Sequence, residues 1–343
     1  MDLTWQLAVG VAVEGVDVSG PFRRRLVSVT WTDAAGVDSD ELEVVLADHT
    51  RFAPIEEPEP GVELELRLGA RGDPVGTFVV DETEISDMPG TLTIRASGAA
   101  LMQTRGGRSP MTTAKTRSWP AGTTLPSMAA TIAGEHGLTP AVGRSLRDVV
   151  LGHVDQRAES DVSLLTRIAR EHDALVKPTG RHLVVARRGE GRTASGASMP
   201  VIGLLRSEVS GWSRTRSEPA GSGKVVAVWR DRSAAADVEV EVGDGEPVRR
   251  LRHVYPDEAA ARAAAESERA RARRAKEALS FTMPGRVDMV AEALVRPVGW
   301  HASLAGGGLW AVTRAVHRVA GSWSVRVQAE PVTDRVGSEP AEG

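Results

Sequence analysis

The chain carries many ionisable side chains, but not at the spacings that catalysis or metal binding requires. It has eight His and 46 Asp and Glu residues. His136, His153, His172 and His182 lie far apart, and none forms a His-x-x-x-His or His-Glu-x-x-His pair. The densest cluster is Glu171-His172-Asp173, which could hold a metal ion. Its place at the end of a predicted helix favours a charged C-terminal turn instead.

Nucleophile and phosphate-binding motifs are equally hard to find. Ala194-Ser195-Gly196 and Gly221-Ser222-Gly223 lack the Gly-x-Ser-x-Gly elbow. Gly306-Gly307-Gly308 precedes a predicted strand, so it favours a hairpin turn over a phosphate cradle. With no Cys, the chain has neither a disulfide nor a zinc-thiolate site. Carboxylates distant in sequence can still pair in space, but the sequence predicts no recognisable active site, cofactor or metal, and we expect no enzyme.

Charge is unevenly distributed along the 343 residues. Residues 1–100 carry seven Arg and no Lys against nineteen Asp and Glu, a net charge of −12, whereas residues 101–200 have a net charge of +6. An acidic first third argues against a nucleic-acid grip there, because phosphate binding needs Lys and Arg. No apolar run is long enough to span a bilayer, and the N-terminal residues lack a secretory signal, so we expect no membrane insertion.

Alternating apolar residues predict strands in the first third of the chain. The expected strands begin with residues 3–13 and continue at 26–31, 42–46 and 62–68, followed by a hairpin over 75–99 that turns at 87–90. We expect no helix among these residues. Closely spaced strands with Gly and Pro turns predict a barrel-like first domain over 1–105.

The remaining chain predicts a small module and a second β domain. Residues 104–118 resemble a flexible linker, and helices are expected after Thr123 or Thr124 and after Ser160, within a small α/β module that ends at residue 190. Strands resume over 191–330, with one Ala- and Arg-rich helix over 257–279. A basic nucleic-acid-binding helix is an alternative there, but interleaved Glu residues disfavour it. Residues 331–343 are expected to be disordered. The predicted fold class is therefore α+β and mostly β.

Three blocks of sequence resemble the phage late-control D family, which are tail or baseplate hub proteins related to the hub part of contractile injection spikes. The first block covers residues 39–44, 76–82 and 92–96, and the second covers 117–119, 131–138, 155–156 and 159–169. The third comprises the Ala-rich helix, residues 284–286 and 308–312, and His317. Departures fall in the third block, where Ala291-Glu292 replaces a Pro-Gly turn and Ser322-Trp323-Ser324 replaces a Gly-Tyr-x-Thr pattern.

The resemblance implies two similar barrel-like antiparallel β domains that flank the α/β module. It also implies a homotrimer whose six barrels form a pseudo-sixfold ring between the tail tube and a central spike. The motif residues are expected to be structural rather than catalytic. They are Phe78, Asp81, Glu82, Trp119, Asp155, Ser160, Asp161, Leu164, Gly285, Gly308, Trp310 and His317.

The same resemblance implies partners and a location. Partners would be the spike, the tail tube protein, and the tape-measure and baseplate wedge proteins, with genome or cargo passing through the lumen without specific binding. The protein would be assembled in the bacterial cytoplasm and reside in the virion tail baseplate, or in a phage-like particle. The alternative is a tail-tip component that binds or cleaves peptidoglycan through the module over 123–185.

Overall fold

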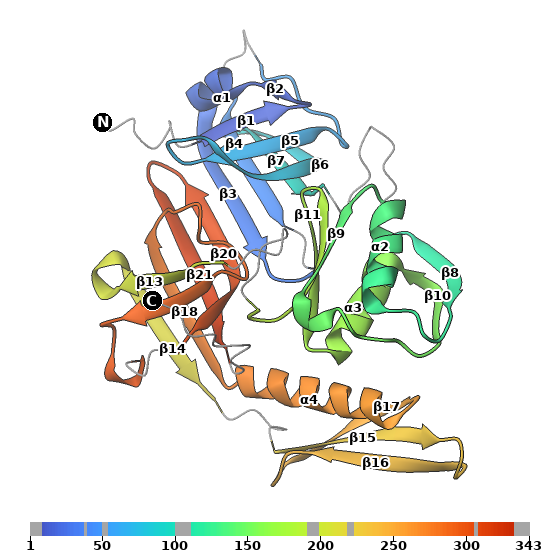
Figure 1. Ribbon diagram of the computed structural model, residues 1–343. Coiled ribbons are helices and arrows are strands. Elements are labelled where there is room, and N and C mark those ends of the chain that lie inside the picture. The colour runs from blue at the N-terminus through green and yellow to red at the C-terminus, as the bar shows by residue number, and fades with distance from the viewer. Residues whose placement is uncertain are drawn as a thin grey trace, which may run out of the picture.

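A single large sheet joins the beginning and the end of this protein. The computed structural model describes residues 9–37, 40–49, 54–99, 111–190, 199–217, 223–304 and 308–332. Thirteen of the described strands form one sheet, which confirms the mostly β prediction (Figure 1). Its order is β14-β18-β21-β20-β3-β4-β7-β6-β5-β1-β2, with β19 joined to β20 and β13 joined to β19.

The first half of the large sheet follows the predicted alternation. Its elements are β1 (Val9–Val13), β2 (Val16–Asp17), α1 (Ser19–Arg25), β3 (Leu26–Ala34), β4 (Glu41–Ala47), β5 (Glu63–Leu68), β6 (Asp73–Asp87) and β7 (Gly90–Gly98). The predicted hairpin is confirmed, because β6 and β7 pair from Phe78↔Gly98 to Asp87↔Gly90. The inward residues of β4, β5 and β7 share one hydrophobic core with Phe78. The start of the expected first strand lies outside the described residues.

The expectation that the first third lacks a helix is wrong. Helix α1 occupies the segment around Gly20-Pro21 that suggested a strand break. Proline fits the first turn of a helix, where its missing N–H has no partner to lose. Phe22 turns inward and is 8% exposed, so this short helix covers part of the first core.

The α/β module contains two helices between two small sheets. Its elements are β8 (Ala114–Trp119), α2 (Leu125–Glu135), β9 (Thr139–Val142), β10 (Val154–Ser160), α3 (Asp161–Glu171), β11 (Ala174–Thr179) and β12 (His182–Arg187). Residues 104–110 of the predicted linker lie outside the described residues. Strand β8 corrects the prediction for the rest, because Lys115 and Arg117 lie on a strand that pairs with β10. Both helix starts are confirmed, with Thr124 and Ser160 as N-caps.

The second half of the large sheet completes a separate core. Its strands are β13 (Val201–Leu205), β14 (Gly211–Arg216), β18 (Glu277–Pro284), β19 (Leu294–Val298), β20 (Trp310–Val319) and β21 (Trp323–Pro331). Strands β13 and β19 pair in parallel, which departs from the expected all-antiparallel arrangement. Residues 333–343 of the predicted tail lie outside the described residues, whereas Pro331 is the last residue of β21.

A separate three-stranded sheet, called the third sheet below to distinguish it from the two halves of the large sheet, projects from the second half with one helix on it. It contains β15 (Lys224–Asp231), β16 (Ala236–Val242) and β17 (Val248–Tyr255), and α4 (Glu258–Arg274) covers one of its faces (Figure 1). These three strands therefore lie outside the large sheet to which their neighbours in sequence belong. The predicted helix end at 279 is wrong, because Leu279, Phe281 and Met283 alternate inward along β18.

The two halves meet where β3 pairs with β20. Residues 29–34 of β3 lie opposite residues 314–319 of β20 in antiparallel register. His317 is 1% exposed, stacks on Trp31 at 4.6 Å between ring centroids, and shares a hydrogen bond with the Met289 carbonyl at 2.8 Å. Backbone pairing and ring stacking thus connect the halves directly.

A buried ionic cluster adds the α/β module to this junction. Lys177 on β11 donates to the Ala34 carbonyl at 2.8 Å and forms ion pairs with Asp33 and, at 3.1 Å, with Asp40. The second oxygen of Asp33 accepts a hydrogen bond from the Ala291 N–H at 2.8 Å. The Asp33 carboxylate, which belongs to the first half, therefore contacts both the module and the second half.

The turn at Ala291-Glu292 keeps the geometry expected of a Pro-Gly pair. Glu292 adopts φ +67, a left-handed conformation that glycine favours and other residues rarely adopt. Its N–H donates to the Val312 carbonyl, and the Val312 N–H donates to the Ala293 carbonyl, both at about 2.8–2.9 Å. The substitution changes the residue type, while the surrounding backbone bonds hold the turn in place.

Asp40 gives the junction a defined pH response. Burial and the neighbouring Asp33 charge raise the pKa of Asp40 to about 7, although Lys177 opposes the shift. The native carboxyl then holds a proton that the unfolded chain releases, so this group lowers stability as pH rises from 4 to 7. We expect Asp40→Asn to gain stability relative to wild type over that window, by at most about 1.4 kcal/mol per pH unit.

Urea unfolding of both proteins between pH 4 and 8 measures this difference. Burial also raises the pKa of Glu292 to about 7, and that contribution is common to both proteins and cancels. Asp237→Asn, which removes a carboxylate half exposed on the third sheet, is the matched control. Parallel pH profiles for wild type and Asp40→Asn would contradict the assignment.

Candidate functional site

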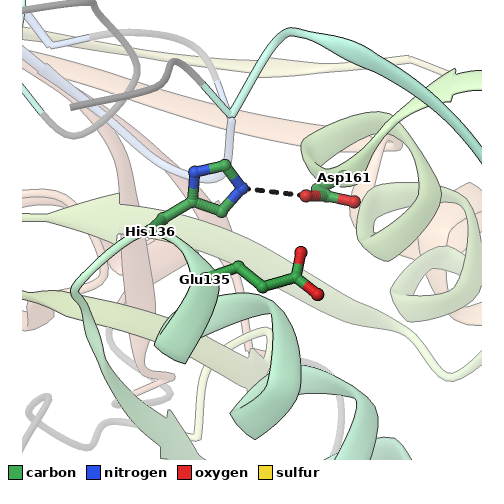
Figure 2. A group of neighbouring side chains, drawn as sticks. All are labelled: Glu135, His136 and Asp161. Atoms are coloured by element: carbon green, nitrogen blue, oxygen red, sulfur yellow. Dashed lines mark hydrogen bonds and ion pairs between the residues drawn. The ribbon is translucent and has the colours of Figure 1, made fainter. Parts of the chain in front are cut away.

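A group of charged side chains in mutual contact lies in the α/β module. Asp161 is fully buried at the start of α3, and His136, at the end of α2, is 4% exposed. Their side chains meet at 2.8 Å between His136 Nε2 and Asp161 Oδ2, with Glu135 beside them (Figure 2). Glu135, His136 and Asp161 together have the residue types of a metal site.

Two cations from β8 occupy the same carboxylates. Lys115 Nζ lies 2.7 Å from Glu135 Oε2 and 2.5 Å from Asp161 Oδ2. Arg117 reaches Glu135 Oε1 at 2.5 Å and Asp161 Oδ1 at 2.7 Å. Each of the four carboxylate oxygens of Glu135 and Asp161 is thus in contact with a positively charged nitrogen of Lys115 or Arg117. This arrangement favours ion pairs over binding of a divalent metal ion. The group Lys115, Arg117, Glu135, His136, Gln156 and Asp161 is called the module cluster below.

Local structure positions each member of the module cluster. Lys115 and Arg117 are two apart on β8, so both side chains lie on the same face of that strand. Gln156 on β10 accepts from Arg117 at 2.8 Å and donates to Asp161 Oδ1 at 2.9 Å. Ser160 caps α3, which places the Asp161 carboxylate in the first turn, where the helix dipole favours a negative charge.

Asp161 stays charged despite its burial. Burial alone would raise the pKa of this carboxyl, but hydrogen bonds from Lys115, Gln156 and His136 and the Arg117 charge lower it to about 2. A catalytic acid or base needs a pKa near the working pH. A carboxylate that is ionised at neutral pH and fully engaged by its neighbours instead suits a structural role, here the connection of β8, β10, α2 and α3.

Five predicted motif residues gather around the module cluster. Asp161 is a member of the cluster, and Ser160 is the N-cap of α3. Leu164, one turn further along α3, is fully buried in the module core. The Trp119 ring lies under the Arg117 guanidinium at 4.5 Å. Asp155 lies at the exposed edge and accepts from Ser118 Oγ at 2.7 Å.

The other motif residues are distributed over the large sheet. Phe78 is 1% exposed in the first core. Asp81 accepts from Ser97 Oγ at 2.6 Å, and Glu82 pairs with Arg95 at 3.0 Å.

In the second half, packing explains three of the remaining four motif residues. Trp310 and His317 are buried on β20. A Cβ at Gly285 would lie 2.1 Å from the Trp323 ring, so only glycine fits there. No described atom lies within 4 Å of a Cβ built on Gly308, and packing does not explain that glycine.

The remaining candidate sites from the sequence are a charged cluster at residues 171–173 and three Ser- or Gly-rich motifs. The predicted charged turn is confirmed, because α3 ends at Glu171 and Asp173 receives Arg274 Nη1 at 2.7 Å. The Ser195, Ser222 and Gly306-Gly307 motifs lie outside the described residues. Sequence reasoning missed Lys115 and Glu135 as partners of Asp161, because they lie on other elements. The alternation of Lys115 and Arg117 was the available signal.

Comparison with known proteins now assigns the chain to a family. A model of the phage tail baseplate hub (GPD) matches residues 75–323. The chain belongs to the phage tail baseplate hub family. The match confirms the resemblance to phage hub proteins, and it places the protein in the tail baseplate of a phage or phage-like particle.

A curated relative agrees with this assignment. The probable baseplate hub protein of Escherichia phage 186 is 35% identical over 195 residues, covering 56% of this chain and 48% of that protein. The chain thus spans about half the length of the curated relatives it matches.

The solved structures share the fold. The 43 kDa tail protein of prophage MuSo2 from Shewanella oneidensis has a TM-score of 0.70 at 16% identity, covering 94% of this hub chain and 98% of that chain. The Escherichia coli c3393 protein, a type VI secretion component, has a TM-score of 0.60 at 13% identity, covering 96% of this chain and 79% of that chain. No helix in the described ranges of the hub protein is long and apolar enough to cross a bilayer.

Replacing Asp161 should expose the structural role of the module cluster. Asp161→Asn leaves Lys115 and Arg117 with Glu135 as their only carboxylate in the module cluster, so we expect a loss of about 2–4 kcal/mol in unfolding free energy at pH 7. Wild-type stability from this group is lost as pH falls from about 4 to 2, and the variant should lack that acid dependence. Denaturant unfolding followed by circular dichroism measures both effects.

Asp155→Asn is the matched control, since Asp155 lies in the same module with a side chain 36% exposed. We expect this variant to change stability by less than about 1 kcal/mol. Equal destabilisation by the two substitutions would contradict a special role for Asp161.

Proposed function

We propose that this protein is a structural, non-enzymatic hub whose trimer forms a pseudo-sixfold ring between the tail tube and the central spike. The observation that carries the proposal is the β3–β20 pairing, which sets two strand-rich halves with separate cores side by side in one chain. Three copies would then present six β units around an axis, which suits a hexameric tube on one side and a trimeric spike on the other.

The domain division predicted from sequence is part of this proposal. Residues 1–105 and 191–330 would supply the two ring units, and the module over 106–190 would lie outside the ring. Asp33 supports a fixed geometry between these parts, because it contacts Lys177 of the module and the Ala291 backbone of the second half. Tape-measure and baseplate wedge proteins would be further neighbours in the particle.

The acidic first half suits the wall of a channel. Strands β4 and β6 lie on either side of β7. Glu43 of β4 and Glu82 and Glu84 of β6 project toward Arg95 on β7, at 3.5, 3.0 and 3.2 Å. Three carboxylates around one guanidinium leave this face negatively charged. If the face lines the lumen, it would repel passing DNA over roughly one Debye length, about 8–10 Å, and so let genome or cargo pass without sticking.

Mass measurement tests the ring directly. We expect native mass spectrometry of the purified protein, alone or with its spike neighbour, to show a species of three chains of 36.4 kDa each. Strand-edge and apolar contacts between copies provide the physical reason. A strictly monomeric protein under both conditions would refute the trimeric hub.

Charge reversal tests the channel. In assembled particles, Glu82→Lys with Glu84→Lys should slow release of DNA or cargo, because a positive wall attracts phosphate. Release kinetics by dye fluorescence measure the effect. The control reverses Asp237 and Glu241 on β16 of the third sheet, away from the large sheet. Unchanged release in the β6 variant, or a particle map with this face on the outside of the ring, would contradict the assignment.

A further inference from the structure

A cleft of about 790 Å³ separates the α/β module from the third sheet. Helix α3 forms one wall, α4 forms a second, and strand β17 forms the third. Strand β17 is an edge strand of the third sheet and supplies five lining residues, Arg249, Leu251, Arg252, His253 and Tyr255. Neither the module cluster nor the junction at β3 and β20 includes these lining residues.

Arginine dominates the charge of the cleft. Its lining includes five Arg residues against two Glu residues, and the five are Arg167, Arg170, Arg249, Arg252 and Arg271. Glu268 is already engaged by Arg249 at 3.0 Å and by Arg271. Arg167 pairs with Glu159 at 2.8 Å. Burial raises the pKa of Glu171. With five guanidinium groups against two carboxylates, the lining of the cleft carries a net positive charge.

The arginines crowd one another, and two have no partner among the described residues. Burial and the nearby charges of Arg170 and Arg249 lower the pKa of Arg271 to about 10. No hydrogen bond or ion pair of the Arg170 or Arg252 side chain occurs within the described part of the chain. An incoming anion would relieve this repulsion and gain charge-assisted hydrogen bonds.

Apolar side chains also line the cleft. Val162 of α3, Leu251 and Tyr255 of β17 and Ala264 of α4 line it. Tyr255 is 6% exposed, and His253 meets its ring edge-on at 4.9 Å between centroids. A ligand that fills this cleft needs apolar groups as well as negative charges.

Strand β17 also offers an open edge. Within the described residues it pairs with β15 alone, and β15 pairs with β16 on its other side. The backbone N–H and C=O groups on the far side of β17 therefore have no strand partner. An extended peptide can add to such an edge, with main-chain bonds giving affinity and side-chain contacts giving specificity.

We propose that this cleft binds an extended acidic peptide segment of a partner protein, which adds as a strand to β17 and alternates carboxylates with apolar side chains. Its carboxylates would meet the arginines of the cleft, and its apolar side chains would cover Leu251 and Tyr255. A nucleic-acid strand suits the cleft less well, because Glu171 and Glu268 lie among the arginines and a phosphate chain carries no apolar side chains.

Fluorescence anisotropy with a labelled ten-residue peptide of alternating Glu and Val tests the proposal on the full-length protein. We expect saturable binding that weakens as salt rises. Arg170→Glu with Arg252→Glu should weaken it about tenfold or more, a change of at least about 1.4 kcal/mol. Arg318→Glu, at an exposed position on β20 outside the cleft, is the matched control and should leave binding unchanged.

Two further probes separate the binding modes. The same peptide N-methylated at alternate residues should bind more weakly, because it cannot form the strand ladder. A Lys-Val peptide of equal length should not bind. The proposal is overturned if the Glu-Val peptide fails to bind, if Arg318→Glu weakens it as much as the cleft variant does, if N-methylation has no effect, or if a single-stranded oligo-dT of equal charge binds more tightly.

Discussion

The antiparallel pairing of β3 with β20 is the constraint on which the rest of the structure depends. It requires residues 29–34 to lie against residues 314–319. The chain between these two strands must therefore lead away from the pair and come back to it. The α/β module and the third sheet are segments of this intervening chain, and each folds around its own hydrophobic core. The halves of the large sheet are thereby fixed side by side by ladder hydrogen bonds rather than by a linker.

Buried charged side chains fix the position of the module relative to the large sheet, which the β3–β20 hydrogen bonds alone do not determine. Asp33 orients the module through Lys177 and the second half through the Ala291 N–H. On the other side of the module, Arg274 of α4 bonds Asp173 and lies 3.2 Å from Glu330 of β21. Removing one partner of such pairs leaves an uncompensated charge, which costs more than a lost surface ion pair. The module is therefore tied to the large sheet at two separate places.

Sequence reasoning succeeded where the signal is local. Alternation predicted β4, β5 and β7 because one face of each lies on a core, and Thr124 and Ser160 marked both module helices. It failed where context decides. Pro21 lies in the first turn of helix α1. The polar segment before Trp119 forms β8, whose Lys115 and Arg117 pair with carboxylates of α2 and α3.

The candidate site was predictable only in part. Asp161 stood out through its family motif, but its partners Lys115 and Glu135 come from other elements. Asp33 and Lys177 lie 144 positions apart, and no periodicity links them. The third sheet was missed for a related reason. Its strands show the same alternation of apolar residues as those of the large sheet, and only the three-dimensional pairing shows that they form a separate sheet.

The β3–β20 pairing also orders events during translation. Until β20 leaves the ribosome, β3 presents a row of unsatisfied backbone groups beside β4. At about 5–20 residues per second this exposure lasts roughly 15–60 s. A nascent hub therefore carries an open sheet edge for most of its synthesis, and polysomes holding several such chains are where misassembly between copies would begin.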